Sequence, residues 1–376
     1  MPNNRSRWAL AWRLFLWSLA NPYGKLPIFA SEFDAMKRLL LLVTCLVLVA
    51  PAFAQQNIIT LDKLNLDTRA DFTYENYLNN DTSAHGFQGK YLRFRIDGTI
   101  TDKFSYHLRQ RINTPNIGFA NTFFQGTDWA YLNWYLTDRF HLSAGKQVVA
   151  IGGWEYDTDP VDIYYGTDFW NHVCCYEMGI SLNYQDRAKK NLVLFQMTNS
   201  PFITASMQGI YSYNLMWYGD FDIFKTAYSV NMIEYRPGQF INYISLGNKI
   251  KYDILEMYVD LQNRASFEQE RFFGQDFTAL IGAGVDVGDK WILFAKAGYD
   301  FNKAQAHTTP DPFDQYVAPG RKVDFESLGF EYYPMGDRNL RVHFCGSHTN
   351  VDGDNNFQVN LGLTWKVDLL HSVLNK

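Results

Sequence analysis

The residues of this sequence best suited to chemistry are arginines at alternate positions of an expected hairpin over residues 91–111. Because side chains on a strand point alternately to its two faces, the guanidiniums share one face and the opposite face is apolar. In a narrow passage, such charges order water and sort solutes by charge. The candidate residues are Arg93, Arg95, Arg109 and Arg111, with His107 on the same face and Arg69 from the preceding segment.

The surroundings of this hairpin decide what its arginines can do. A water-soluble sandwich would bury the apolar face and spread mixed charges over the other. A transmembrane β-barrel would instead turn the apolar face to lipid and the arginines into a wet lumen. The two folds differ in how many such segments they need and in how these are connected.

Alternating segments of this kind recur from residue 58 onward, most of them about 8–12 residues long. We count sixteen, and bacterial outer-membrane barrels have an even number of strands. The predicted strands are 63–77, 89–100, 104–113, 127–136, 140–148, 177–185, 191–198, 214–220, 225–235, 240–251, 254–263, 276–287, 291–301, 324–333, 339–348 and 356–367.

The connections between these segments alternate between seven short ones and eight that are mostly longer. Nearly all of the short ones carry the Asp or Gly residues of tight turns. The alternation predicts an all-β fold, namely a 16-stranded antiparallel up-and-down transmembrane β-barrel with periplasmic turns and extracellular loops. We see no periodic Gly or Trp-Asp signature of a sandwich or propeller. A barrel of this size leaves an aqueous channel.

The third of the longer loops, residues 149–176, is long enough to fold into the lumen and narrow it. In one interpretation, its acids lie across a constriction from the arginines, and the two charged walls set a transverse field. In the other, the acids are a solvated loop surface, and the arginines pair with Asp67, Asp71 and Asp97 and stiffen the wall. We favour the constriction because the arginines outnumber the acids on their two strands. The acids of this expected constriction loop are Glu155, Asp157, Asp159 and Asp162.

The start of the chain resembles a targeting segment. Residues 36–54 contain a basic pair and an apolar run too short to span a membrane, and Ala-Phe-Ala at residues 52–54 fits a signal-peptidase site. We expect residues 1–35 to be a non-native N-terminal extension and residues 55–376 to form the mature barrel. The expected location is the outer membrane of a Gram-negative bacterium.

Composition excludes several other classes of protein. Without residues 1–54 the chain has 28 Lys and Arg against 37 Asp and Glu, a net charge of −9, so nucleic acid is not an expected partner. Cys174, Cys175 and Cys345 lack metal-site spacing, and we expect them to serve in packing or loops, with no cofactor and no metal. Residues 352–356 resemble part of a calcium loop but equally fit a hairpin turn.

One motif offers an enzymatic alternative. His141 and Ser143 have the His-x-Ser-x-Gly spacing that resembles outer-membrane phospholipases, where such a pair performs nucleophilic catalysis. Strand parity turns both side chains toward the lumen and away from lipid tails, and sixteen strands exceed the number in that enzyme class. We therefore expect no enzyme and keep phospholipase-like activity as the alternative.

Several segments together resemble the phosphate-selective porin O and P family over roughly residues 58–368. They are Tyr91-Leu-Arg-Phe-Arg-Ile-Asp-Gly98, Phe104-Ser-Tyr-His-Leu-Arg-Gln-Arg111, Gly145-Lys-Gln147 and the long third loop. The resemblance implies a trimeric 16-stranded outer-membrane pore that passes anions or other small solutes passively. It also implies that the arginines of the hairpin match the arginine ladder of that family.

Two departures from this family argue against true phosphate specificity. The fifth loop, residues 236–239, has no lysine cluster, and the third loop is acidic. Strand parity also places Glu256 and Asp260 in the lumen. We therefore predict a porin, surrounded by outer-membrane lipid, for passive diffusion of small hydrophilic solutes, with anions such as phosphate among its candidate solutes.

Overall fold

The computed structural model describes most of the expected barrel. The described residues are 59–79, 82–112, 126–173, 175–203, 209–266, 269–304 and 317–370. The N-terminal extension, the signal peptide and Cys174 lie outside these ranges, so the expectations for them stay predictions.

Sixteen β-strands form nearly all of the described structure, and all sixteen predicted segments are confirmed as strands. They are β1 (Lys63–Tyr77), β2 (Thr82–Thr101), β3 (Phe104–Arg111), β4 (Thr127–Tyr135), β5 (Phe140–Val148), β6 (Tyr176–Gln185), β7 (Asn191–Asn199), β8 (Tyr211–Phe221), β9 (Phe224–Arg236), β10 (Gln239–Tyr252), β11 (Leu255–Ala265), β12 (Asp276–Val287), β13 (Trp291–Asn302), β14 (Lys322–Tyr332), β15 (Leu340–Val351) and β16 (Asp354–Asp368). Three short helical segments lie between β5 and β6, namely α4 (Trp154–Asp157), η2 (Pro160–Asp162) and α5 (Asp168–His172).

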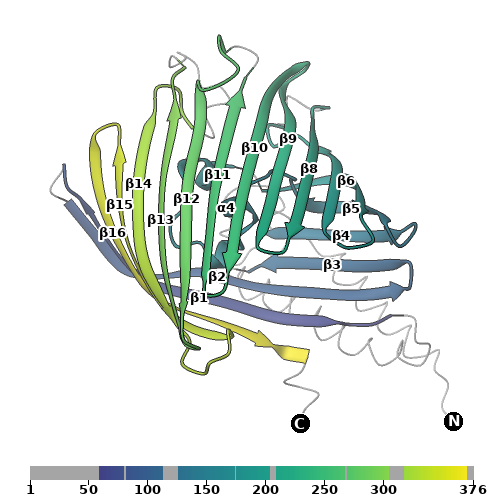
Figure 1. Ribbon diagram of the computed structural model, residues 1–376, viewed down its shortest axis with the longest axis horizontal. Coiled ribbons are helices and arrows are strands. Elements are labelled where there is room, and N and C mark those ends of the chain that lie inside the picture. Colours follow the sequence, from purple (N-terminus) through teal and green to yellow (C-terminus); the bar gives the residue numbers. More distant parts are fainter. Residues whose placement is uncertain are drawn as a thin grey trace, which may run out of the picture. The chain divides into compact units, whose positions relative to one another are not determined.

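The strands form one closed antiparallel barrel (Figure 1). Each strand pairs with its neighbours in sequence, and β1 pairs with β16 to close the ring, with Phe72 opposite Leu361. Closure leaves no strand edge unpaired, as a sheet in lipid requires. The predicted 16-stranded up-and-down barrel is therefore confirmed. Within the described residues, no helix has the length and apolar character to cross a membrane.

The two faces of the barrel wall differ as period-two alternation predicts. On β8, Ser212 and Asn214 turn inward and are buried, whereas Leu215 between β7 and β9 turns outward and is 49% exposed. The same contrast recurs around the ring, where exposed Leu, Ile, Val and Phe side chains alternate with buried polar ones. The interior of the barrel is therefore polar, and the outside supplies an apolar surface for lipid.

Several strand ends differ from the sequence-based prediction, with the largest changes at the start of β2 and between β15 and β16. β2 begins at Thr82 rather than at residue 89, so the β1–β2 hairpin is longer. The expected loop 349–355 is a two-residue turn in which Asp352 and Gly353 have φ of 54° and 101°. These residue types accept positive φ in tight hairpins. Residues 354–356 belong to β16, and the segment forms the hairpin turn that was the other interpretation.

We predict that Leu215→Arg lowers the free energy of unfolding by about 2–4 kcal/mol, because it places a charge on the lipid face in the middle of β8. Ile223→Arg is the matched control, since Ile223 is exposed in the turn between β8 and β9 and its charge can reach water. Urea titration of the protein folded into lipid vesicles measures the free energy of unfolding of both variants. Equal losses in the two variants would contradict the assignment of this face to lipid.

Candidate functional site

The third loop, residues 149–175, folds into the lumen, as its length predicts. At its base the backbone N–H of Val149 donates to the carbonyl of Cys175 at 2.9 Å. Phe169 of α5 packs edge-on against Tyr243 of β10, with ring centroids 5.9 Å apart, inside a buried apolar cluster. The loop is therefore anchored to the wall by a small hydrophobic core.

The first helical turn of the loop, α4, lies against β10 and β11 (Figure 1). Asp260 of β11 accepts the backbone N–H groups of Trp154 and Glu155 at 2.9 and 2.8 Å. Gly153, with φ of 111°, allows the turn that presents these groups. A Cβ atom at Gly247 would lie 2.8 Å from the Cα of Gly153, so the approach of loop to wall requires glycine there. Sequence parity correctly placed Asp260 in the lumen.

Glu155, an expected constriction acid, is buried and paired. Its carboxylate contacts the ammonium of Lys296 on β13 and accepts hydrogen bonds from the backbone and hydroxyl of Thr167 at 3.0 and 2.6 Å. Lys296 also donates to the carbonyl of Tyr165 at 2.7 Å. Glu155 therefore ties the start of the loop to its second half and to the wall.

Asp159 contacts the arginine row directly. Its two oxygens accept from the two terminal nitrogens of Arg93 at 2.5 Å each, and Arg109 lies 3.4 Å away. Arg93 also donates to Asp67 at 2.9 Å. Burial alone would raise the pKa of Asp159, but Arg93, helped by Arg109, holds it below its usual range. Asp159 is therefore ionised at neutral pH, and the expectation of two walls facing each other across water is wrong for this acid.

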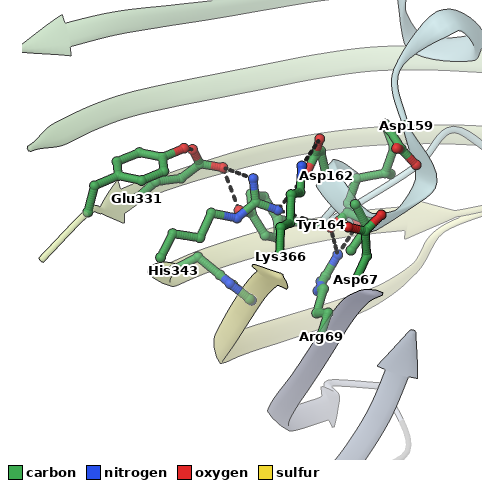
Figure 2. A network of polar contacts seen from close by, with 12 residues as sticks. Asp67, Arg69, Asp159, Asp162, Tyr164, Glu331, His343 and Lys366 are labelled. Carbon is green, nitrogen blue, oxygen red and sulfur yellow. Dashed lines mark hydrogen bonds and ion pairs between the residues drawn. The ribbon is translucent and has the colours of Figure 1, made fainter. Parts of the chain in front are cut away.

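Asp162 and Tyr164 contact the wall near the barrel seam, where β1 pairs with β16, and the adjacent strands β14 and β15 (Figure 2). Asp162 lies 2.6 Å from Arg341 and 3.6 Å from Lys366. The hydroxyl of Tyr164 donates to Glu331 at 2.5 Å.

Arg69 of β1 contacts backbone carbonyl groups in the same part of the loop. It donates to the carbonyls of Val161 and Ile163 at 3.2 and 2.6 Å and pairs with Asp71 at 2.6 Å. Its guanidinium also lies 4.7 Å from the ring centre of Tyr164. Arg69 thus positions the loop and is itself buried.

Asp157 differs from the other three acids because it is exposed. It accepts a hydrogen bond from the hydroxyl of Tyr218 on β8 at 2.8 Å. It lines a cavity of about 490 Å³ between the loop and β2–β8. A second cavity of about 250 Å³ lies between the loop and β10–β15. The loop therefore narrows the lumen and leaves space on two sides.

Every arginine of the expected selectivity row has a carboxylate partner. The pairs that the wall-stiffening interpretation predicts are present, and two further acids complete the set. Five arginines meet five carboxylates in these pairs: Arg69 with Asp71, Arg93 with Asp67 and Asp159, Arg95 with Asp97, Arg109 with Asp128 and Asp159, and Arg111 with Asp128. His107 also contacts Asp97, at 2.9 Å.

Exposure divides the row into two groups. Arg69, Arg93 and Arg109 are at most 3% exposed, whereas the side chains of Arg95 and Arg111 are 37% and 35% exposed. Only the second group has much contact with lumen water. A selectivity role for the row stays a prediction, and the exposed pair is where it is best tested.

Asp128 was missed because strand parity places it on the lipid face of β4. The register between β3 and β4 shifts at Arg109 and Gln110, which face Trp129 and Thr127. A β-bulge of this kind inserts one extra residue into one strand and changes the direction of its side chain. Asp128 is consequently 2% exposed and lies 2.7 Å from both Arg109 and Arg111. The sequence carries no signal for this bulge.

The cations that pair with Glu155 and Asp162 were also not predicted, although strand parity places them in the lumen. Lys296, Arg341 and Lys366 lie at inward positions of β13, β15 and β16, opposite Ser327, Thr364 and Asp67. Alternation places them in the lumen, but their partners depend on how the loop folds.

His141 and Ser143 face the lumen, as parity predicts, and they contact different partners. The Ser143 hydroxyl donates to Asn133 at 2.7 Å and accepts from Asn183 at 3.2 Å. His141 packs against Tyr135, with ring centroids 5.4 Å apart. Within the part of the chain that the structure describes, no hydrogen bond joins His141 to Ser143. The Ser143 hydroxyl is thus held by amides of β4 and β6.

The described cysteines, Cys175 and Cys345, are half-buried and buried. Burial raises the pKa of Cys175 to about 11, so its thiol is neutral, and Cys345 is buried on β15. Among the described residues, no group of three or more His, Cys, Asp or Glu side chains is arranged to hold a metal ion.

Comparison with known proteins agrees with this geometry. Residues 63–217 match the family model "Phosphate-selective porin O and P". The resemblance predicted from the sequence is thus confirmed for the part of the porin fold that contains the arginine hairpin and the third loop. No curated protein sequence matches the chain.

Solved porin structures share the fold at low identity. The anion-selective porin from Comamonas acidovorans superposes with a TM-score of 0.61 at 10% identity, over 82% of this chain and 100% of that one. The trimer form of OmpT, an outer membrane protein of Vibrio cholerae, gives 0.57 at 13%, over 83% and 100%. The outer membrane channel DcaP of Acinetobacter baumannii gives 0.56 at 12%, over 83% and 98%.

We predict that Asp260→Ala loosens the third loop, because two backbone N–H groups of α4 lose their acceptor at about 1–3 kcal/mol each. Protease cleavage within residues 149–175 should become faster, and single-channel conductance should rise. Glu256→Ala is the matched control, since Glu256 lies on the same face of β11 and pairs with Lys249 and Lys251 instead. If both variants behave alike, Asp260 does not hold the loop.

Proposed function

We propose that this chain is an outer-membrane porin of a Gram-negative bacterium that passes small hydrophilic solutes by passive diffusion. The observation that carries the proposal is a closed barrel whose lumen is polar and stays open on two sides of an inward loop. A 16-stranded barrel is wide enough for an aqueous channel, which a smaller, side-chain-filled barrel is not. The porin family match supports the same conclusion.

The paired charges of the arginine row argue for weak selectivity between anions and cations. Five guanidiniums paired with five carboxylates leave no net positive charge in the row. An anion-selective or phosphate-specific pore needs an excess of positive potential along its path. We therefore propose a general channel for which anions such as phosphate are solutes among others.

Assembly, export and the absence of enzymatic activity also belong to this proposal. The solved trimer form of OmpT from Vibrio cholerae, which shares the fold, supports a homotrimer. The features of residues 36–54 support secretion to the outer membrane and a mature chain from Gln55. The hydrogen bonds of Ser143 support a structural role for the His141 and Ser143 pair rather than phospholipase activity.

Planar-bilayer recording of the protein from Gln55 onward tests the function. We predict stepwise ohmic conductance, because open space flanks the loop, and a reversal potential near zero in a potassium chloride gradient. The double variant Arg95→Gln and Arg111→Gln should shift this potential toward cations, since these two arginines are the exposed ones.

Arg139→Gln is the control for this recording, because Arg139 lies in the turn between β4 and β5, outside the arginine row. Its reversal potential should equal that of the unmodified protein. Absence of conductance steps from well-folded protein would contradict the porin function. An unchanged potential in the double variant would show that the row is structural.

A further inference from the structure

The lumen wall is divided into a charged part and an uncharged part. Among the strands, ion pairs with the third loop come from β2, β3, β13, β15 and β16. The described residues of β4–β8 that line the 490 Å³ cavity carry no formal charge. This uncharged part has its own composition, which consists mainly of aromatic rings, amides and hydroxyls.

Aromatic rings surround the cavity from both the wall and the loop. All are half-buried, and the guanidinium of Arg109 covers one face of Trp129 at 3.6 Å from the ring centre. Accessible Trp and Tyr rings bind flat apolar surfaces while their polar tips make hydrogen bonds. The rings are Trp129, Tyr131, Tyr156, Trp170, Tyr176 and Tyr218.

Between the rings, amide and hydroxyl side chains form a continuous hydrogen-bonded network. Ser181 donates to the amide oxygen of Gln147 at 2.9 Å, and Gln196 donates to the same oxygen at 3.3 Å. Asn183 and Ser143 continue the network toward Asn133 on β4. The amides of Gln147, Gln196 and Asn133 both donate and accept, and their neighbours fix their orientation. The wall therefore presents preorganised polar groups of both kinds.

Two groups of this wall have unused hydrogen-bonding capacity. The indole N–H of Trp129 is buried and finds no acceptor among the described residues. Likewise, no donor in the described parts of the chain reaches the amide oxygen of Asn183, whose nitrogen donates to Ser143 and Ser181. A hydroxyl group can accept from the first and donate to the second. An ionised phosphate or carboxylate oxygen can only accept.

The ionic groups at the edge of the cavity balance one another. Arg95 and Arg109 line it, and so do Asp157 and Asp159. Arg95 and Arg109 are each paired with a further carboxylate, at 2.7 Å in both cases. The cavity therefore offers an anion no excess of positive charge.

We infer that this cavity is a binding site for a neutral cyclic sugar, a mono- or disaccharide, on its way through the channel. The ring of such a sugar has an apolar C–H face for the aromatic side chains and hydroxyls for the amide network. A volume of about 490 Å³ falls within the usual range of small-molecule sites. The inference rests on the proposed porin function for its context, and it names a solute class for the same lumen.

The site is tested by measuring how far an added sugar reduces the ion current through the channel. Maltose or sucrose added to one side of a planar bilayer should reduce single-channel current in a saturable manner. Sorbitol is the matched control, because it has hydroxyls but no rigid ring face, and inorganic phosphate is the anionic control. Both should block far less than the cyclic sugars.

Substitutions locate the block. Trp129→Leu should weaken maltose block about tenfold, as expected when a stacking ring is lost, whereas Trp129→Tyr should restore most of it. Trp134→Leu is the matched control, since Trp134 lies on the same strand but is 45% exposed on the outer face. Should Trp129→Leu fail to fold, Tyr131→Leu replaces it.

The outcomes separate this inference from the porin proposal. A conducting channel that phosphate blocks and maltose and sucrose do not would overturn the sugar site and leave the porin intact. If the folded protein does not conduct, tryptophan fluorescence during maltose titration in detergent decides: a saturable change that Trp129→Leu weakens supports the site, and no change refutes it.

Discussion

The structure depends on the burial of guanidinium groups inside a membrane barrel. A charge removed from water is stable only when an opposite charge and hydrogen bonds compensate it. Arg93, at 2% exposure, meets this requirement with Asp67 on the neighbouring strand and Asp159 on the third loop. The loop carboxylate is therefore part of the wall's charge balance. One interaction fixes the loop in the lumen and removes the net charge that the arginines would otherwise present.

The other loop acids extend the same principle around the barrel. Glu155 reaches Lys296 on β13, and Asp162 reaches Arg341 and Lys366 near the seam. These cations lie on β13, β15 and β16, and the arginines that meet Asp159 lie on β2 and β3, so the charged groups gather where the loop is bound. The wall of β4–β8 is left with amides, hydroxyls and aromatic rings beside the larger cavity. The position of the loop and the character of the solute path thus have a common physical cause.

The sequence predicted the strands well and their side-chain partners poorly. Period-two alternation and turn residues identify all sixteen strands, because each strand is a local pattern. The length of the third loop likewise predicted its inward fold. Ion pairs depend on register and on loop conformation, which are not local. Asp128 illustrates the first limit, since a bulge beside Arg109 turns it inward against parity. Asp159 illustrates the second, because its contact with Arg93 joins residues 66 positions apart.

The most direct test of this account is a double-mutant cycle between wall and loop. Arg93→Gln, Asp159→Asn and the double variant are unfolded by urea from lipid vesicles, and the free energies of unfolding are compared. The account predicts a favourable coupling of about 1–3 kcal/mol, as measured for residues in one ion-pair network. Additive effects, with no coupling between the two substitutions, would show that the loop carboxylate does not compensate the buried guanidinium.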